Sequence, residues 1–266
     1  MTDGPALAVG LCSITLRALP AEEVLAVAAR AGVTTIEWGA DVHVPPGDVD
    51  RARALARRGA DLGIDVASYG SYLGAGPLLP DGGEVGAVLD AAEALGTSTV
   101  RVWTEVGVTP DAPEADRARV RDLTAALADV AADRGLGLAL EHHPGTLTHT
   151  AAAGAALLAE LDRPDVRTHW QPDPALSPAA AVEELRTVLP HLASVHAFTW
   201  GPTGIDDRRP LAEGAELWRP ALALATTGPG PRPRPVLLEY VRGDDPDQVV
   251  ADAATLRRWI DTLPAP

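Results

Sequence analysis

Short apolar runs alternate along the chain with longer segments rich in alanine and polar residues, and the alternation repeats eight times. The runs are rich in Val, Leu and Ile and carry few charges, which is typical of parallel strands covered on both faces. We therefore predict strands over residues 7–12, 34–38, 64–69, 98–103, 136–142, 166–171, 192–198 and 236–240.

The intervening segments are predicted helices, because capping residues precede several of them and glycines follow. They span residues 20–31, 48–62, 84–95, 114–134, 151–161, 178–189, 212–225 and 246–262. Eight such alternations in 266 residues predict an α/β protein of one domain, residues 1–266, folded as a single (β/α)8 TIM barrel. A doubly wound open sheet is less favoured, because residues 7–17 lack the glycine-rich first turn of that fold.

The amino-acid composition limits the classes of binding partner and of catalytic chemistry that the protein can have. The formal charge of −15 disfavours nucleic acid, and no apolar run approaches the roughly 20 residues of a membrane span. We expect a small-molecule substrate and leave homo-oligomers open. A single cysteine, Cys12, and a start without a signal-peptide pattern predict a cytoplasmic protein. All 22 basic residues are arginine, which excludes lysine Schiff bases and Walker-type phosphate loops.

Four predicted strands of the second half end in side chains that can bind a metal. They are Glu141, Gln171, His196 and Glu239, with Asp173 just beyond Gln171. Active sites of barrels lie at the carboxyl ends of the strands, so we expect these side chains to converge. Side-chain alternation turns Glu141, His143 and Glu239 into the barrel and His142 away from it. Two inward glutamates require a cation between them, either a metal ion or an arginine.

The first half supplies further candidates at the same rim. They are Glu37, Trp38, His43, Tyr69, Arg101 and Trp103. Aromatic rings beside an arginine can form a wall for a hydroxyl-rich substrate, or can simply pack the barrel end. Arg209, after the seventh strand, could clamp a substrate oxygen or serve only solubility. The loop of residues 72–84 could be a lid or an ordinary surface loop.

At these residues the chain resembles the sugar phosphate isomerase/epimerase family of the xylose-isomerase-like TIM barrel superfamily. The stretches that carry the resemblance are IEWGADVHVPPG, VASYGSY, VRVW, LEHHPGTLT, THWQP and RPLAEG. It implies one divalent ion, Mn²⁺ or Mg²⁺, held by Glu141, Gln171, His196 and Glu239. It also implies that the two glutamates move the substrate proton, and that Glu37 and Arg209 contact the substrate.

The chain departs from the family pattern at three positions. Gln171 stands where an aspartate is usual, with Asp173 as a substitute ligand; Pro174 replaces a histidine and Phe198 a lysine. The leading hypothesis is a metal-dependent isomerase or epimerase acting on a polyhydroxylated carbonyl compound, with Glu141 and Glu239 as base and acid. A lyase or dehydratase with the same enolate chemistry and a non-catalytic sugar-binding barrel remain alternatives. An abasic-site endonuclease is disfavoured, because its metal cluster needs more histidines than His43 in the first half.

Overall fold

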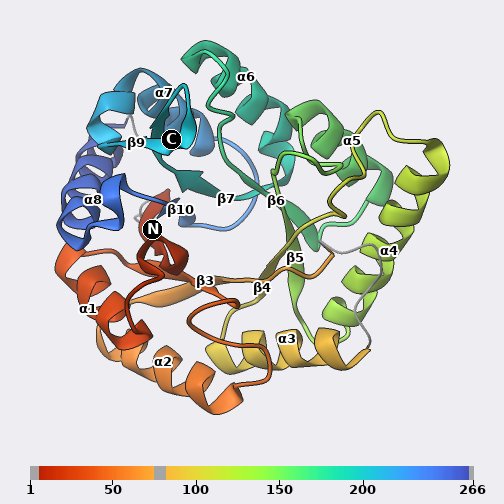
Figure 1. Ribbon diagram of the computed structural model, residues 1–266, viewed down its shortest axis with the longest axis horizontal. Helices are drawn as coiled ribbons and strands as arrows, with labels where there is room; N and C mark the ends of the chain where they lie inside the picture. Colours follow the sequence, from red (N-terminus) through yellow and green to blue (C-terminus); the bar gives the residue numbers. More distant parts are fainter. Residues whose placement is uncertain (1–5, 75–81, 264–266) are drawn as a thin grey trace, which may run out of the picture.

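A computed structural model describes residues 6–74 and 82–263. Its parallel strands close into a barrel in the order β1-β10-β7-β6-β5-β4-β3-β2 (Figure 1). The barrel strands are β1 (Leu7–Cys12), β2 (Thr35–Gly39), β3 (Asp65–Gly70), β4 (Thr99–Val102), β5 (Gly137–Glu141), β6 (Val166–Trp170), β7 (Leu192–Ala197) and β10 (Arg234–Leu238). Each predicted strand overlaps one of these, and the predicted TIM barrel is confirmed.

Helices surround the barrel as an outer ring (Figure 1). They are α1 (Ala21–Ala31), α2 (Val49–Asp61), α3 (Gly82–Leu95), α4 (Glu114–Ala132), α5 (Ala151–Leu161), α6 (Pro178–Val188), α7 (Ala215–Ala225) and α8 (Pro246–Asp261). Short 3-10 helices are η1 (Ser13–Leu16), η2 (Leu189–His191), η3 (Leu211–Gly214) and η4 (Arg242–Asp244). No helix in the described part of the chain is both long and apolar enough to cross a membrane.

The helix-capping residues and the alternation of side chains along the strands act in the structure as the sequence predicts. Asp48, Thr150 and Ser177 each accept a hydrogen bond from a backbone N–H of the helix that follows, which satisfies a donor that the first turn leaves open. Leu138 and Leu140 of β5 are buried against the helices, whereas Glu141 is on the opposite parity. Alternation along β5 therefore sets which residues enter the barrel.

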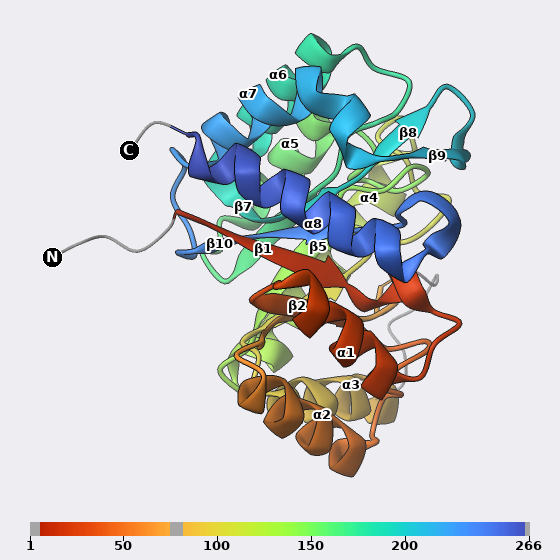
Figure 2. The same ribbon diagram turned by 90° about the vertical axis from the view of Figure 1, so that its left-hand side faces the viewer.

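A hairpin outside the barrel was not predicted. β8 (Thr199–Gly201) pairs antiparallel with β9 (Gly204–Arg209), and the hairpin lies apart from the barrel strands (Figure 2). It follows β7 directly, so it belongs to the carboxyl end of the barrel. Strand β10 ends earlier than predicted, because Tyr240 has a φ of 46°, which extended backbone does not allow. Of the loop 72–84, for which a lid and an ordinary surface loop were both left open, residues 75–81 lie outside the described part of the chain.

Candidate active site

A cavity of about 380 Å³ opens at the carboxyl ends of the strands. Arg101, Glu141, Gln171 and Glu239 are among the residues that line it. Arg101, Glu141 and Glu239 are each at most 5% exposed, so their charges meet in a region that excludes most water. Charges in such a region interact more strongly than at the surface.

Arg101 lies between two of the glutamates. Its Nη1 is 2.7 Å from Glu141 Oε2, and its Nε is 3.6 Å from Glu37 Oε1. The guanidinium fits because residue 70 is glycine, since a Cβ there would lie 2.7 Å from Arg101 Nη2. The sequence required either a metal ion or an arginine between inward carboxylates, and the structure places this arginine beside Glu141.

Glu141 is held by one of its two carboxylate oxygens. Oε2 accepts the indole N–H of Trp103 at 2.5 Å in addition to Arg101. Burial by itself raises the pKa of Glu141, but Arg101 and His196 outweigh burial and hold it below the ordinary value. Oε1 receives only a long contact, 3.4 Å, from the amide nitrogen of Gln171. Glu141 is thus an ionised carboxylate with one oxygen available to a ligand.

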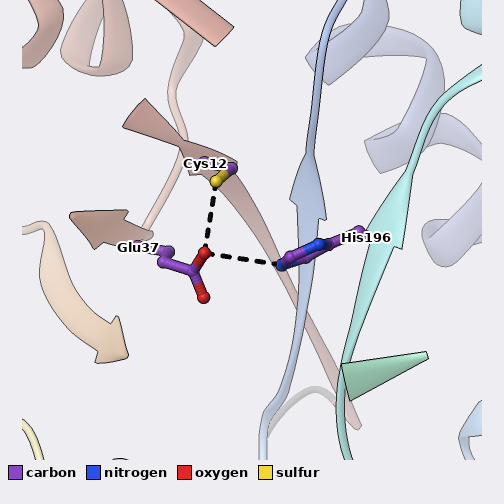
Figure 3. A group of neighbouring side chains, drawn as sticks. All are labelled: Cys12, Glu37 and His196. Atoms are coloured by element: carbon purple, nitrogen blue, oxygen red, sulfur yellow. Dashed lines mark hydrogen bonds and ion pairs between the residues drawn. The ribbon is translucent and has the colours of Figure 1, made fainter. Parts of the chain in front are cut away.

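His196 connects the two ends of the buried cluster. Its Nδ1 is 3.5 Å from Glu239 Oε1, and its Nε2 is 3.6 Å from Glu37 Oε1. Burial disfavours the charged ring, but Glu239 and Glu37 raise the pKa of His196 well above its ordinary value. Glu37 also accepts a hydrogen bond from the thiol of Cys12 at 3.3 Å, so it lies between Cys12 and His196 (Figure 3).

Among the residues that the structure describes, two groups of donors are close enough to hold a metal ion. In each group the ligand atoms lie within 4.8 Å of one another. The first is Glu141, His196 and Glu239, and the second is Cys12, Glu37 and His196. The first group contains three of the four ligands that the sequence indicates.

Gln171 and Asp173, which the sequence offered as the fourth metal ligand, lie outside both donor groups. The amide nitrogen of Gln171 donates to the carbonyl of His142 at 2.8 Å and faces Glu141, so the side chain acts here as a donor toward that carboxylate. Asp173 lines the cavity, but its carboxylate accepts the N–H of Ala175 and belongs to neither donor group. An aspartate at position 171 could not donate to Glu141 in this way.

The predicted substrate contacts divide into two sets. Arg101, Trp103 and His143 line the cavity, and the Trp103 and His143 rings stack with centroids 3.8 Å apart. Glu37 lies buried outside the lining, bound to Arg101 and His196. The remaining predicted contacts, which are Trp38, His43, Tyr69 and Arg209, do not line the cavity.

Those four side chains have other partners. The Tyr69 hydroxyl donates to the carbonyl of Val44, and the buried ring of His43 bonds Ser13 Oγ. Trp38 is fully buried and makes a T-shaped contact with the His43 ring. Arg209 pairs with its neighbour Asp207 at 2.7 Å on the β8–β9 hairpin. His142, predicted to face away, is buried in the lining, with each ring nitrogen within 3.2 Å of a backbone carbonyl oxygen.

Sequence reasoning missed three buried groups around Glu37. Ser68 Oγ donates to Glu37 Oε2 at 2.6 Å, Cys12 bonds Oε1, and His169 Nδ1 is 3.4 Å from Oε2. Ser68 is the register partner of Glu37 across β2 and β3, next to a β-bulge. Strand parity alone does not reveal such a register shift. The sequence feature that could have revealed these groups is the presence of polar residues at inward-facing positions of consecutive strands.

We predict that the folded protein loses stability in acid because of the buried His169. Burial lowers the pKa of His169 to about 3, against the opposing effect of Glu37. Below about pH 6.5 the unfolded chain therefore binds a proton that the folded protein does not, and the free energy of unfolding should fall by up to about 1.4 kcal/mol per pH unit until about pH 3. Urea unfolding of chelator-treated protein at several pH values measures this slope. His169→Asn should flatten it, and the exposed His149→Asn should not; an unchanged slope in His169→Asn would contradict the prediction.

Comparison with known proteins identifies the family. A model of xylose isomerase-like TIM barrels matches residues 25–259. The chain therefore belongs to the xylose isomerase-like TIM barrel family, as the sequence resemblance indicated. No curated protein matches the chain.

Solved structures share the fold at low sequence identity. A probable 3-DHS dehydratase from Bacillus anthracis has a TM-score of 0.74 and 16% identity, over 94% of this chain and 99% of that one. D-allulose 3-epimerase from Methylomonas sp., in complex with D-allulose, has a TM-score of 0.68 and 20% identity, over 97% and 98%. The IOLI protein with a zinc atom has a TM-score of 0.75 and 14% identity, over 98% and 100%. At these identities the likeness shows the fold alone.

Proposed function

We propose that this protein is an isomerase or epimerase that moves a proton on a sugar or related polyhydroxylated carbonyl compound, with one divalent ion held by Glu141, His196 and Glu239. The convergence of these three donors within 4.8 Å, at a cavity, carries the proposal. Epimerases and a zinc-containing protein among the similar structures support it.

The residues present fit a divalent cation. His196 Nδ1 is buried without a hydrogen-bond partner in the described residues and faces Glu239, as expected of a nitrogen kept for a ligand. Glu37, Glu141 and Glu239 bring three negative charges, and Arg101 neutralises one of them. An ion bound at Nδ1 would displace the proton that Glu239 and Glu37 favour on His196, and the two negative charges that remain would match Mn²⁺ or Mg²⁺, which prefer carboxylate oxygens. Glu37 would accept the Nε2 proton of His196 and orient the ring.

The geometry assigns each glutamate a task. Arg101 and Trp103 hold Oε2 of Glu141, so Oε1 is the atom that would accept or return a substrate proton. Glu239, whose Oε1 is 3.5 Å from His196 Nδ1, would act as the second acid or base. A divalent ion bound here would polarise the substrate carbonyl and acidify the neighbouring C–H bond. Low exposure would protect the proton from exchange with bulk water between abstraction and return.

A non-catalytic sugar-binding barrel is the second candidate. The Arg101–Glu141 pair favours it, because arginine already supplies a cation where catalysis would place the metal. The same pair is also compatible with catalysis, since it engages only one oxygen of Glu141.

Deuterium exchange tests the proposal. Protein loaded with Mn²⁺ and incubated with a panel of ketoses in deuterated water should place deuterium on the carbon next to the carbonyl. Metal analysis should find about one divalent ion per chain, lost in Glu239→Ala and kept in the matched control Glu216→Ala on α7. A product that has lost water identifies a lyase instead. If ketoses bind but incorporate no deuterium, the protein is a non-catalytic barrel and the proposed enzymatic activity is wrong.

A further inference from the structure

Half of the aromatic side chains of the protein gather at one cavity. The chain has ten Phe, Tyr and Trp residues, and five of them line the cavity above Glu141: Tyr72, Trp103, Phe198, Trp200 and Tyr240. We propose that the substrate carries an uncharged aromatic ring next to its hydroxylated part, as in an aryl-substituted sugar. This inference rests on the proposed function and names the substrate class of the same site.

The aromatic residues form two walls. In the first, Trp103 stacks on His143 at 3.8 Å, with Tyr72 edge-on to Trp103 at 5.3 Å. In the second, Phe198 stacks on Trp200 at 3.8 Å. The residues of the first wall follow β3, β4 and β5, those of the second follow β7, and β6 lies between β5 and β7 in the barrel. Two walls on separated strands can hold a planar group between them.

The walls are fixed before a ligand arrives. The Trp103 indole N–H is bonded to Glu141 at 2.5 Å, and the Trp200 indole N–H donates to the carbonyl of Tyr240 at 3.4 Å. Rings already held in place lose little conformational freedom on binding, so stacking contributes more of its energy to affinity. Such pre-organisation is expected of a ring-binding site.

Several polar groups of the cavity lining already have partners within the protein. Each ring nitrogen of His142 faces a backbone carbonyl oxygen, and Oδ1 of Asp173 accepts the N–H of Ala175. Tyr72 and Ile205, at the rim, are 42% and 41% exposed. Exposed apolar side chains beside a cavity mark a ligand surface. A sugar alone would use the floor of the cavity, where Glu141 and Glu239 lie, and leave this apolar surface uncovered.

Charge excludes a phosphorylated substrate. Arg101 is the only arginine in the described lining, and it already contacts Glu37 and Glu141. The lining also contains Glu239 and Asp173, and Glu141 and Glu239 would neutralise a bound divalent ion, so no spare positive charge would face the outer part of the cavity. A phosphate would be repelled there. The ring-bearing substrate therefore carries no phosphate.

Calorimetric titration with matched probes tests the inference. The probes are phenyl and methyl β-D-glucosides, the same pair of galactosides, and glucose 6-phosphate, added to Mn²⁺-loaded protein. At least one phenyl glycoside should bind about tenfold or more tightly than its methyl partner, because stacking and apolar burial add together. Trp200→Ala should remove most of this preference and Trp200→Phe should keep it. Ile205→Ala should weaken it, whereas Val130→Ala, which truncates an exposed apolar side chain on α4, should not.

Equal affinity within every pair, no measurable binding of either phenyl glycoside, or tightest binding of glucose 6-phosphate would overturn the aromatic substrate class. The readout is binding, so it is independent of turnover. If a phenyl glycoside is preferred but no ketose exchanges deuterium, the proposed enzymatic activity is wrong and the aromatic ligand class stands. Deuterium exchange on simple ketoses without aryl preference refutes the ligand class alone.

Discussion

Glu239→Gln should lower the rate of deuterium exchange by roughly 10²- to 10⁴-fold, the usual contribution of a general acid or base. Glutamine keeps the shape and a neutral oxygen at this position but cannot take a proton. Glu239 is only 4% exposed, so the barrel must tolerate the loss of one buried charge; removing a carboxylate from a crowded acidic cluster makes this easier. The measurement is the single-turnover exchange rate at saturating substrate and metal.

Folding and metal content are the controls for this variant. Circular dichroism should stay unchanged, and Glu216→Gln on α7 should exchange at the rate of the unchanged protein. Metal content, measured in parallel, separates loss of the ion from loss of the acid or base. A metal-loaded Glu239→Gln protein that retains more than about a tenth of the exchange rate would show that another group moves the proton.

Arg101→Met should reduce the free energy of unfolding by about 3–5 kcal/mol in metal-free protein. Methionine fills similar space but leaves Glu37, which is fully buried, and Glu141 without the cation beside them. An unpaired buried carboxylate must either remain charged in a region of low dielectric or take up a proton. Denaturant unfolding near neutral pH measures the change.

The companion variants make the cause testable. Arg101→Met combined with Glu37→Gln should recover part of the lost stability, because one orphaned charge is gone. Arg53→Met, which breaks the exposed pair with Asp50, should change stability little. If Arg101→Met unfolds at the same denaturant concentration as the unchanged protein, the Arg101 pairs do not stabilise the fold. Manganese that restores the stability of Arg101→Met would show that an ion can replace the guanidinium.

The repeating pattern of apolar runs was enough to predict the barrel, and strand parity was enough to turn Glu141 inward. Both depend on local rules that hold for each strand by itself. The hairpin β8–β9 was missed because Phe198 and Trp200 read as the end of a barrel strand and its loop. For Trp38 and Tyr69 the sequence left open a substrate wall or packing of the barrel end, and the structure packs them away from the cavity. The sequence of a single strand does not reveal which residues of neighbouring elements pack against its side chains.

The sequence by itself therefore determined the class of fold, the absence of lysine chemistry and the rim at which the carboxylates gather. Only the tertiary structure decided that Arg101 pairs with Glu141, that Gln171 donates to this glutamate, and that aromatic rings from β4 and the β7–β8 connection face one cavity. The physical reason is closure of the barrel. Closure fixes the register between strands far apart in sequence, and pairing between side chains depends on that register.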